Sequence, residues 1–344
     1  MAVVTILGAG MMGSALALPL VDHGHEVRLV GTHLDADIVE NLQLRHFHPA
    51  LKLELPRELR VFPVSELGRA LEGAELIGVG VSSPGVRWAA EQLRPYRLAG
   101  RDLVMITKGL DWDGETLRAL PDVLADGLGG GIAPVAVAGP CIAGELARRV
   151  ETCVVLTGRD PDALARVAAR LRAPYYHPFT SPDLLGVEVC AALKNAYAMG
   201  IAFAQGLHER GGGAPGSVAM HNSESAVFAQ AVVEMQRVIG ALDGDPASAV
   251  GLAGVGDLDV TCNGGRTGRF GRLLGLGLGR DAAIERMDGA TLECLDILRV
   301  MRAAAPSLAA RGAGALPLLA HLAEVALDDA PVELPFARFF GALG

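Results

Sequence analysis

The sequence lacks the features of several protein classes. Basic residues are not in excess, because 30 Lys and Arg stand against 39 Asp and Glu, which gives a formal net charge of −9. This balance argues against a nucleic-acid-binding surface. The five cysteines, at positions 141, 153, 190, 262 and 294, are odd in number and never spaced as C-x-x-C. They indicate a reduced, intracellular chain rather than a disulfide framework.

Targeting and membrane-spanning segments are also missing. The N-terminal apolar run ends at Gly8 and has no basic region before it, unlike a signal peptide. No apolar stretch approaches the roughly 18 to 20 residues that a membrane helix requires. We therefore expect a cytoplasmic protein without membrane insertion.

Apolar residues and glycine are abundant. Hydrophobic residues make up 51% of the 344 positions, and 44 positions are glycine, a composition typical of a well-buried α/β protein. Because this length exceeds the usual single core, we expect two domains. Residues 1–183 alternate β-branched runs with helical segments, which predicts a dinucleotide-binding Rossmann domain with a doubly wound parallel sheet. Residues 184–344 are rich in Ala and Leu at helical spacing, which predicts an all-helical substrate and catalytic domain.

The pattern also predicts individual elements. We expect strands over 2–7, 25–30, 76–81, 103–106, 135–137 and 153–156, and C-terminal helices over 184–208, 217–242, 269–277, 290–304 and 315–326.

Gly8, Gly10 and Gly13 form a G-x-G-x-x-G motif between the first predicted strand and a predicted helix. The first glycine allows a tight turn, the second lets the backbone approach a pyrophosphate, and the third permits close packing of helix on strand. The helix N-terminus then offers its N–H groups to the phosphates. The motif predicts a site for a dinucleotide.

The end of the second predicted strand does not decide between NAD and NADP. An NAD-specific site normally has an acidic residue there, but the chain reads Gly31-Thr32-His33, and the first carboxylate is Asp35. No arginine stands there to hold a 2′-phosphate. NAD or NADP therefore remains open.

Lys194 is the most informative residue of the helical half. Its helical neighbours Val187, Cys190, Ala191 and Ala198 are small and apolar. A lysine in such surroundings must pair, reach a cleft or lower its pKa. It is either a residue whose ammonium extends to solvent or an acid–base group. Asp257, taken alone, reads as a helix cap.

Five further segments are distinctive when taken in order. They are T-K-G-L (107–110), A-G-P-C-I-A-G-E (138–145), G-V-E-V-C-A-A-L-K-N (186–195), G-V-G-D-L-D-V-T-C (254–262) and R-T-G-R-F-G (266–271). Together with the glycine motif they resemble the bacterial type of the NAD(P)-dependent glycerol-3-phosphate dehydrogenase family, over nearly the whole chain. The resemblance implies hydride transfer between a nicotinamide and C2 of dihydroxyacetone phosphate or glycerol 3-phosphate, in a homodimer.

The resemblance also implies roles for individual residues. Lys194 exchanges the proton with the substrate oxygen, and Lys108 lies between nicotinamide and substrate. Asn195, Asp257 and Thr261 orient the substrate hydroxyls, and Asp257 belongs with the two lysines to the catalytic group. The other implied substrate contacts are Lys108, Gly139, Cys141, Gly265, Arg266 and Thr267, with Arg266 holding the phosphate. The implied cofactor contacts are Gly8, Gly10, Met11, Met12, Gly13, Thr32, Lys108, Ala143, Arg266 and Glu293.

Three positions depart from the family pattern. The chain reads Gly265-Arg266-Thr267 where family members commonly read S-R-N, Cys141 replaces a Ser or Thr after G-P, and Met12 is unusual within the glycine motif. Losing hydrogen-bond donors beside a phosphate costs on the order of 1–3 kcal/mol each if the substrate is unchanged. An alternative is therefore the same chemistry on a larger tetrulose or pentulose phosphate, with weak activity on dihydroxyacetone phosphate.

Other interpretations stay open. A keto-acid reductase of the ketopantoate type also combines a Rossmann domain with a helical lysine, but it explains G-D-L-x-x-T-C poorly. A catalytically silent nucleotide-sensing protein would not need Lys108, Lys194 and Asp257 together. His46 and His48 have no third ligand at suitable spacing, so we expect no metal.

Overall fold

The computed structural model describes residues 1–217, 220–287 and 292–341. The chain divides into two compact units, Met1–Lys108 with Ala119–Leu184, and Gly109–Arg118 with Leu185–Gly344. The segment 109–118 therefore groups with the C-terminal half, although the pattern above places it in the first domain. The predicted helices 217–242 and 290–304 include residues 218–219 and 290–291, which lie outside the described residues.

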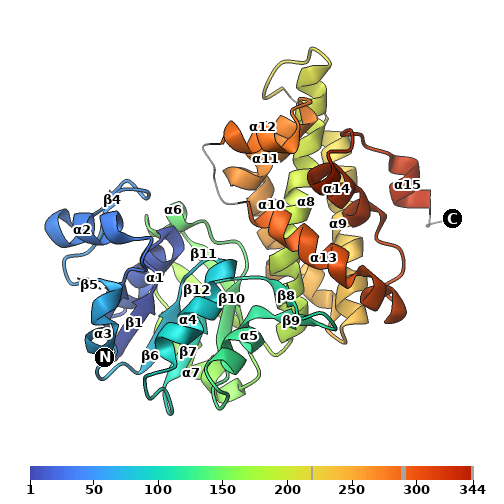
Figure 1. Ribbon diagram of the computed structural model, residues 1–344. Helices are drawn as coiled ribbons and strands as arrows, with labels where there is room; N and C mark the ends of the chain where they lie inside the picture. The colour runs from blue at the N-terminus through green and yellow to red at the C-terminus, as the bar shows by residue number, and fades with distance from the viewer. Residues whose placement is uncertain (218–219, 288–291, 342–344) are drawn as a thin grey trace. The chain divides into compact units, whose positions relative to one another are not determined.

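The first unit contains an eight-stranded sheet in the order β12-β11-β10-β7-β6-β1-β2-β5 (Figure 1). Its neighbouring strands pair in parallel except β10 with β11. The strands are β1 Val3–Leu7, β2 Glu26–Val30, β5 Arg60–Phe62, β6 Leu76–Val79, β7 Asp102–Met105, β10 Val135–Ala138, β11 Thr152–Thr157 and β12 Tyr176–Ser181. A short separate ribbon pairs β3 Phe47–His48 with β4 Leu53–Glu54.

Alternate residues of the strands feed two cores, one on each face of the sheet. In β1, Ile6 packs in a cluster with Leu16 of helix α1 (Met11–Asp22), whereas Leu7 packs in a second cluster with Leu93 of helix α4 (Val86–Leu93). This alternation follows from the two-residue period of a strand. The sheet is therefore doubly wound. The helices of this unit are α1 Met11–Asp22, α2 Ala36–Arg45, α3 Leu67–Ala70, α4 Val86–Leu93, α5 Leu120–Gly127, α6 Ala143–Leu146 and α7 Pro161–Leu171.

The two edge strands of the sheet, β5 and β12, were not predicted from the sequence pattern. β5 has only three residues, and β12 has Pro178 in its middle and ends in Thr180 and Ser181, so neither looks like a buried strand. Proline is tolerated at a sheet edge because a ladder hydrogen bond is not required there. The antiparallel strand β11 also differs from the expected parallel sheet. The preceding connection, 139–151, holds only the single-turn helix α6 instead of the long crossover that a parallel pair needs.

The second unit is helical over its described residues after 185, with the β-ribbon of β8 Leu110–Trp112 and β9 Leu117–Ala119 added from the first half of the chain. Its helices are α8 Leu184–Arg210, α9 His221–Ala241, α10 Asp257–Cys262, α11 Gly265–Gly275, α12 Arg280–Glu285, α13 Glu293–Ala310, α14 Pro317–Asp328 and α15 Phe336–Phe340. A 3-10 helix at Pro246–Val250 and a π-helical turn at Leu252–Gly256 connect α9 to α10.

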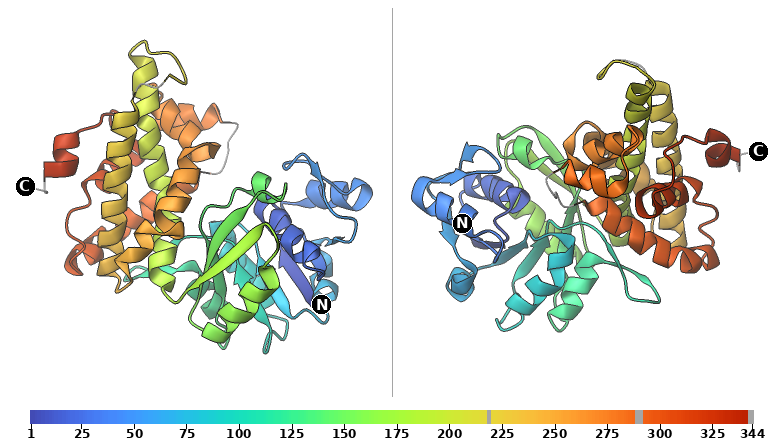
Figure 2. Two further views of the ribbon diagram at one scale, coloured as in Figure 1. Left: turned by 180° about the vertical axis from the view of Figure 1, so that it is seen from behind. Right: turned by 45° about the horizontal axis from the view of Figure 1, so that its top comes forward.

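Helix α8 is the centre of this unit, with α9 alongside it in the views of Figures 1 and 2. Helix α11 lies so close that a Cβ on Gly271 would be 2.1 Å from the Met199 carbonyl oxygen. An 18-residue window of α8 reaches a mean hydropathy of 1.3, so the expectation that no stretch is long and apolar enough to span a membrane is wrong for this helix. Because 83% of that window is buried inside the structure, its apolar length is explained by packing.

Candidate functional site

In the first unit, predicted site residues gather at the carboxyl ends of the parallel strands. Gly8 follows β1, Thr32 follows β2, Lys108 follows β7 and Gly139 follows β10. The Lys108 Nζ donates a hydrogen bond of 3.2 Å to the Gly139 carbonyl oxygen, which joins the T-K-G and A-G-P segments. Ligands of open α/β sheets bind at this edge, near the point where strand order reverses. Here that point lies between β1 and β6.

The three glycines of the motif meet different surroundings. Gly8 has a φ of +117°, and a Cβ there would lie 2.5 Å from the Gly80 carbonyl oxygen. A Cβ on Gly13 would lie 2.0 Å from the Gly8 carbonyl oxygen. A Cβ on Gly10 would meet no atom within 4 Å. The fold itself therefore requires glycine at positions 8 and 13, whereas position 10 borders open space.

Gly10 is also the N-cap of α1, where no side chain caps the helix. Met11 and Met12 begin the helix, and Met11 is 43% exposed. Backbone N–H groups at such a terminus are suited to an anion, both as donors and through the helix dipole. The uncapped terminus and the open space in front of Gly10 fit the pyrophosphate of a dinucleotide.

Two side chains that the sequence motifs did not assign contact this loop. The Asp35 Oδ2 accepts hydrogen bonds from the backbone N–H of Thr32, at 2.8 Å, and of Ala9, at 3.2 Å. His48 Nε2 lies 3.0 Å from the Ala9 carbonyl oxygen. Asp35 was visible as the first carboxylate after the second strand. The contact of His48 had no signal, because 39 positions separate it from Ala9.

The other predicted residues of this unit lie after β10. Cys141 is half-buried against the core, and Ala143 is buried at the first position of α6. Residues 1–217, 220–287 and 292–341 contain no group of three or more His, Cys, Asp or Glu that could hold a metal ion.

In the second unit, Lys194 of α8 forms an ion pair with Asp257 of α10. The side chain of Lys194 is 12% exposed and that of Asp257 is 1% exposed. Every residue of 186–204 is buried except Lys194 and Asn195. The Lys194 ammonium therefore does not extend into solvent, and Asp257 is not the helix cap, because the N-cap of α10 is Gly256.

The backbone before Asp257 explains its position. Leu252–Gly256 is a π-helical turn, with the Gly256 N–H donating to the Gly251 carbonyl oxygen at 3.2 Å. A Cβ on Gly254 would lie 1.9 Å from the Ala249 carbonyl oxygen, so only glycine fits at position 254 of this turn. Turns of this kind are rare and are often found at functional sites.

Three more predicted residues of this unit are joined by side-chain contacts. The Thr261 hydroxyl donates to the Asp257 carbonyl oxygen at 2.6 Å, one turn earlier in α10. The Asn195 Nδ2 donates to Glu293 Oε2 at 2.9 Å, which connects α8 to the first residue of α13. Positions 195 and 293 were assigned separately to substrate and cofactor, and the structure brings them together.

The start of α11 carries the segment that departs from the family pattern. Gly264 and Gly265 have φ values of +154° and +91°, and no side chain caps the helix. Arg266 is exposed and makes no hydrogen bond or ion pair with another described residue, whereas Thr267 is buried. A guanidinium beside an uncapped helix N-terminus offers two sources of positive potential to a phosphate.

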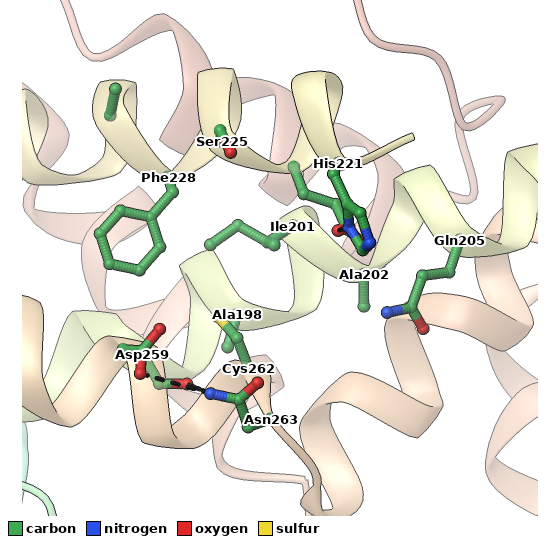
Figure 3. Close-up of a pocket in the computed structure, with 12 residues that line it drawn as sticks. Ala198, Ile201, Ala202, Gln205, His221, Ser225, Phe228, Asp259, Cys262 and Asn263 are labelled. Atoms are coloured by element: carbon green, nitrogen blue, oxygen red, sulfur yellow. Dashed lines mark hydrogen bonds and ion pairs between the residues drawn. The ribbon is translucent and has the colours of Figure 1, made fainter. Parts of the chain in front are cut away.

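A pocket of about 440 Å³ lies between α8, α9 and α10 (Figure 3). It is separate from the residues above, since neither Lys194, Asp257 nor Arg266 lines it. Its ionisable side chains are Asp259, Cys262 and the hydrogen-bonded pair His221 and Glu224, and neither Lys nor Arg lines it. Burial, together with these carboxylates, raises the pKa of the Cys262 thiol to about 12. The pocket does not suit a phosphate.

Comparisons with known proteins cover both units. The family model described as the N-terminus of NAD-dependent glycerol-3-phosphate dehydrogenase matches residues 3–164, and the model for the C-terminus matches residues 183–335. The NADP(+)-dependent glycerol-3-phosphate dehydrogenase of Archaeoglobus fulgidus is 37% identical over 287 residues, 83% of this chain and 84% of that protein. The NAD(P)+ enzyme of Klebsiella pneumoniae is 33% identical over 289 residues, 83% of this chain and 81% of that protein.

Comparison of the fold with solved structures also finds a glycerol-3-phosphate dehydrogenase. The crystal structure of glycerol-3-phosphate dehydrogenase from Coxiella burnetii matches with a TM-score of 0.82 and 28% identity, over 99% of this chain and 98% of that one. The similarity to these proteins thus covers 83% of the chain in sequence and 99% of it in fold.

Proposed function

The chain belongs to the NAD-dependent glycerol-3-phosphate dehydrogenase family, and from this premise we propose that it interconverts dihydroxyacetone phosphate and glycerol 3-phosphate. Membership makes it an oxidoreductase that acts on a CH–OH group with NAD or NADP. The observation that carries the finer proposal is the ion pair of Lys194 with Asp257. It joins two of the distinctive segments, 63 positions apart, in nearly complete burial.

Lys194 is the acid–base group of this proposal. The nicotinamide, when bound, supplies a hydride to C2 of the ketone or removes it from C2 of the alcohol. In reduction, the electron pair of the carbonyl bond moves to the oxygen, and the Lys194 ammonium donates a proton to it. In oxidation, the neutral amine takes the hydroxyl proton back. A positioned group of this kind typically contributes about 10²- to 10⁴-fold to the rate.

Asp257 keeps that ammonium in place. A buried carboxylate holds the Lys194 Nζ in one orientation, and burial strengthens the attraction because little water screens it. Thr261 and Asn195, which are fixed through contacts to Asp257 and Glu293, orient the substrate hydroxyls.

Arg266 binds the phosphate in this proposal. Its planar guanidinium can grip two phosphate oxygens at once, and its lack of a partner among the described residues leaves it available. Gly265 and Thr267 flank it. Cys141 and Gly139, with Lys108, complete the proposed substrate contacts in the first unit.

The first unit binds the coenzyme at Gly8–Gly13, with Thr32, Ala143 and Lys108 as further contacts. We propose that both NAD and NADP are accepted. Asp35 Oδ2 already accepts two backbone N–H groups, so this carboxylate is engaged by the chain itself. The excess of acidic residues supports a protein without a nucleic-acid partner. A cytoplasmic homodimer without membrane insertion completes the proposal.

The test is turnover and binding measured on the same proteins. NADH and NADPH oxidation with dihydroxyacetone phosphate should be seen with the wild type and with Lys52→Ala, a lysine control in the first unit. Lys194→Ala should lose about 10²-fold or more in kcat and keep the wild-type Kd for NADH in titration calorimetry. Coenzyme binding without turnover on any ketose phosphate by the wild type would instead identify a silent nucleotide sensor. Near-wild-type kcat in Lys194→Ala would remove this lysine from the mechanism.

A further inference from the structure

We propose that His48 is a positioning residue of the dinucleotide site, which fixes the Ala9 peptide inside the G-x-G turn and thereby orients the N–H groups that receive the pyrophosphate. The inference rests on the proposed placement of the coenzyme at Gly8–Gly13. It adds a residue that lies outside the glycine motif and outside every segment of the resemblance.

The contacts of Ala9 are the first observation. Ala9 is fully buried between Gly8 and Gly10. Side chains form hydrogen bonds with both its backbone N–H and its carbonyl oxygen. Its N–H donates to Asp35 Oδ2 at 3.2 Å, and its carbonyl oxygen is 3.0 Å from both His48 Nε2 and the Ser14 hydroxyl. Two donors satisfy both lone pairs of that oxygen.

The hydrogen bonds of His48 fix its tautomer. The Leu51 backbone N–H donates to His48 Nδ1 at 3.2 Å, so Nδ1 is the acceptor. In a neutral imidazole the hydrogen must then be on Nε2, which donates it to the Ala9 carbonyl oxygen. His48 is completely buried, and burial lowers its pKa, which favours this neutral form.

The position of the contact explains why it matters for the coenzyme. Gly8 and Gly13 are held against neighbouring backbone, but Gly10 borders open space. The middle of the turn is therefore anchored through Ala9, immediately before the uncapped N-terminus of α1. Hydrogen-bond donors aimed at an anion are effective only when their orientation is fixed in advance. Asp35 supplies that constraint from the N-cap of α2, and His48 supplies it from strand β3.

Two variants of His48 separate positioning from packing. Glutamine can place its Nε2 amide where the imidazole Nε2 lies and keep the bond to Ala9. Asparagine is shorter, so it can accept from Leu51 but does not reach Ala9. Because one neutral hydrogen bond is worth about 1 kcal/mol, we expect His48→Asn to raise the Kd for NADH about 5- to 10-fold. His48→Gln should stay within about 2-fold of the wild type.

Titration of NADH and NADPH into the full-length proteins measures these values, with thermal unfolding of each variant alongside. In kinetics, the KM for NADH should rise about 5- to 10-fold in His48→Asn and stay within about 2-fold of the wild type in His48→Gln. Asp35→Ala is a second test of the same constraint, since it removes the acceptor of the Ala9 N–H. Its effect on Kd should be less than additive with that of His48→Asn, because both act on one residue.

Wild-type affinity in His48→Asn would overturn the inference, and so would equal weakening in the Gln and Asn variants. Either result, with a wild type that binds and turns over, leaves the proposed function intact. A wild type that binds neither NADH nor NADPH would overturn both.

Discussion

The two units build their candidate sites from different materials. In the first unit the site is mainly backbone: a turn over Gly8–Gly13, held by close glycine contacts and followed by an uncapped helix. In the second unit the site consists of side chains on separate helices, with Lys194 paired to Asp257 across 63 positions. Binding at the backbone site requires glycine, which leaves space for the ligand and for the close packing of the turn. The side-chain site instead requires that the buried charges of Lys194 and Asp257 stay paired. The two should therefore respond differently to substitution.

The largest contrast is expected within the glycine motif. Gly10→Val places its side chain in open space, so the free protein should fold with nearly its wild-type melting temperature, whereas dinucleotide binding should be lost because the pyrophosphate needs that space. Gly13→Ala should instead lower the melting temperature sharply, since its Cβ would lie 2.0 Å from a carbonyl oxygen. Calorimetry with NADH and thermal unfolding measure the two effects. Unchanged affinity in Gly10→Val would mean that the motif is a structural turn only.

Asp257→Asn tests how much the side-chain site of the second unit depends on its buried ion pair. It removes the charge that faces a nearly buried ammonium, and breaking such a pair costs about 3 kcal/mol or more of unfolding free energy. Turnover should fall on the order of 10²-fold, with the Kd for NADH unchanged. Asp296→Asn is the matched control, because its ion pair with Arg299 is exposed and contributes below about 1 kcal/mol. Equal effects of the two substitutions would show that the buried pair has no special role.

Arg266→Lys should have a smaller effect, confined to substrate binding. A lysine keeps the charge but cannot form two parallel hydrogen bonds to a phosphate. We expect the KM for dihydroxyacetone phosphate to rise about 10-fold, which corresponds to about 1.4 kcal/mol. Arg269→Lys, on the same helix and also exposed, should leave KM unchanged. A KM that moves equally in both variants would indicate general charge rather than specific binding.

The smallest expected effect is on the pH dependence of stability. Burial lowers the pKa of His48 in the folded chain, so between that value and about 6.5 the unfolded chain binds more protons. Stability should therefore rise with pH through this window and be fully present above it, by about 1.4 kcal/mol for each unit of difference. Urea unfolding of the wild type and His48→Gln at pH 5 to 7 should give a shallower slope in the variant. Identical slopes would show that His48 does not titrate differently on folding.

The same contrast explains what could be predicted from the sequence. The glycine turn was predictable because its residues are neighbours in the chain and each has a local steric reason. Lys194 was recognisable as a lysine on an apolar helix. Its ion pair was not predictable, since Asp257, taken alone, read as a helix cap and joined the catalytic group only through the resemblance. His48 and the grouping of 109–118 with the second unit depend on contacts between distant segments. The edge strand β12 was missed because Pro178 contradicts a buried strand and is acceptable only at an edge.

The most direct test of the account is the specificity constant of the wild type for ketose phosphates of three, four and five carbons, measured with NADH and with NADPH. If Arg266 binds the phosphate and Lys194 serves C2 as proposed, kcat/KM should be highest for dihydroxyacetone phosphate by at least about 10-fold, or about 1.4 kcal/mol in transition-state binding. A higher kcat/KM for a tetrulose or pentulose phosphate would contradict the proposed substrate. It would mean that the departures from the family pattern at Cys141, Gly265 and Thr267 accompany a longer substrate.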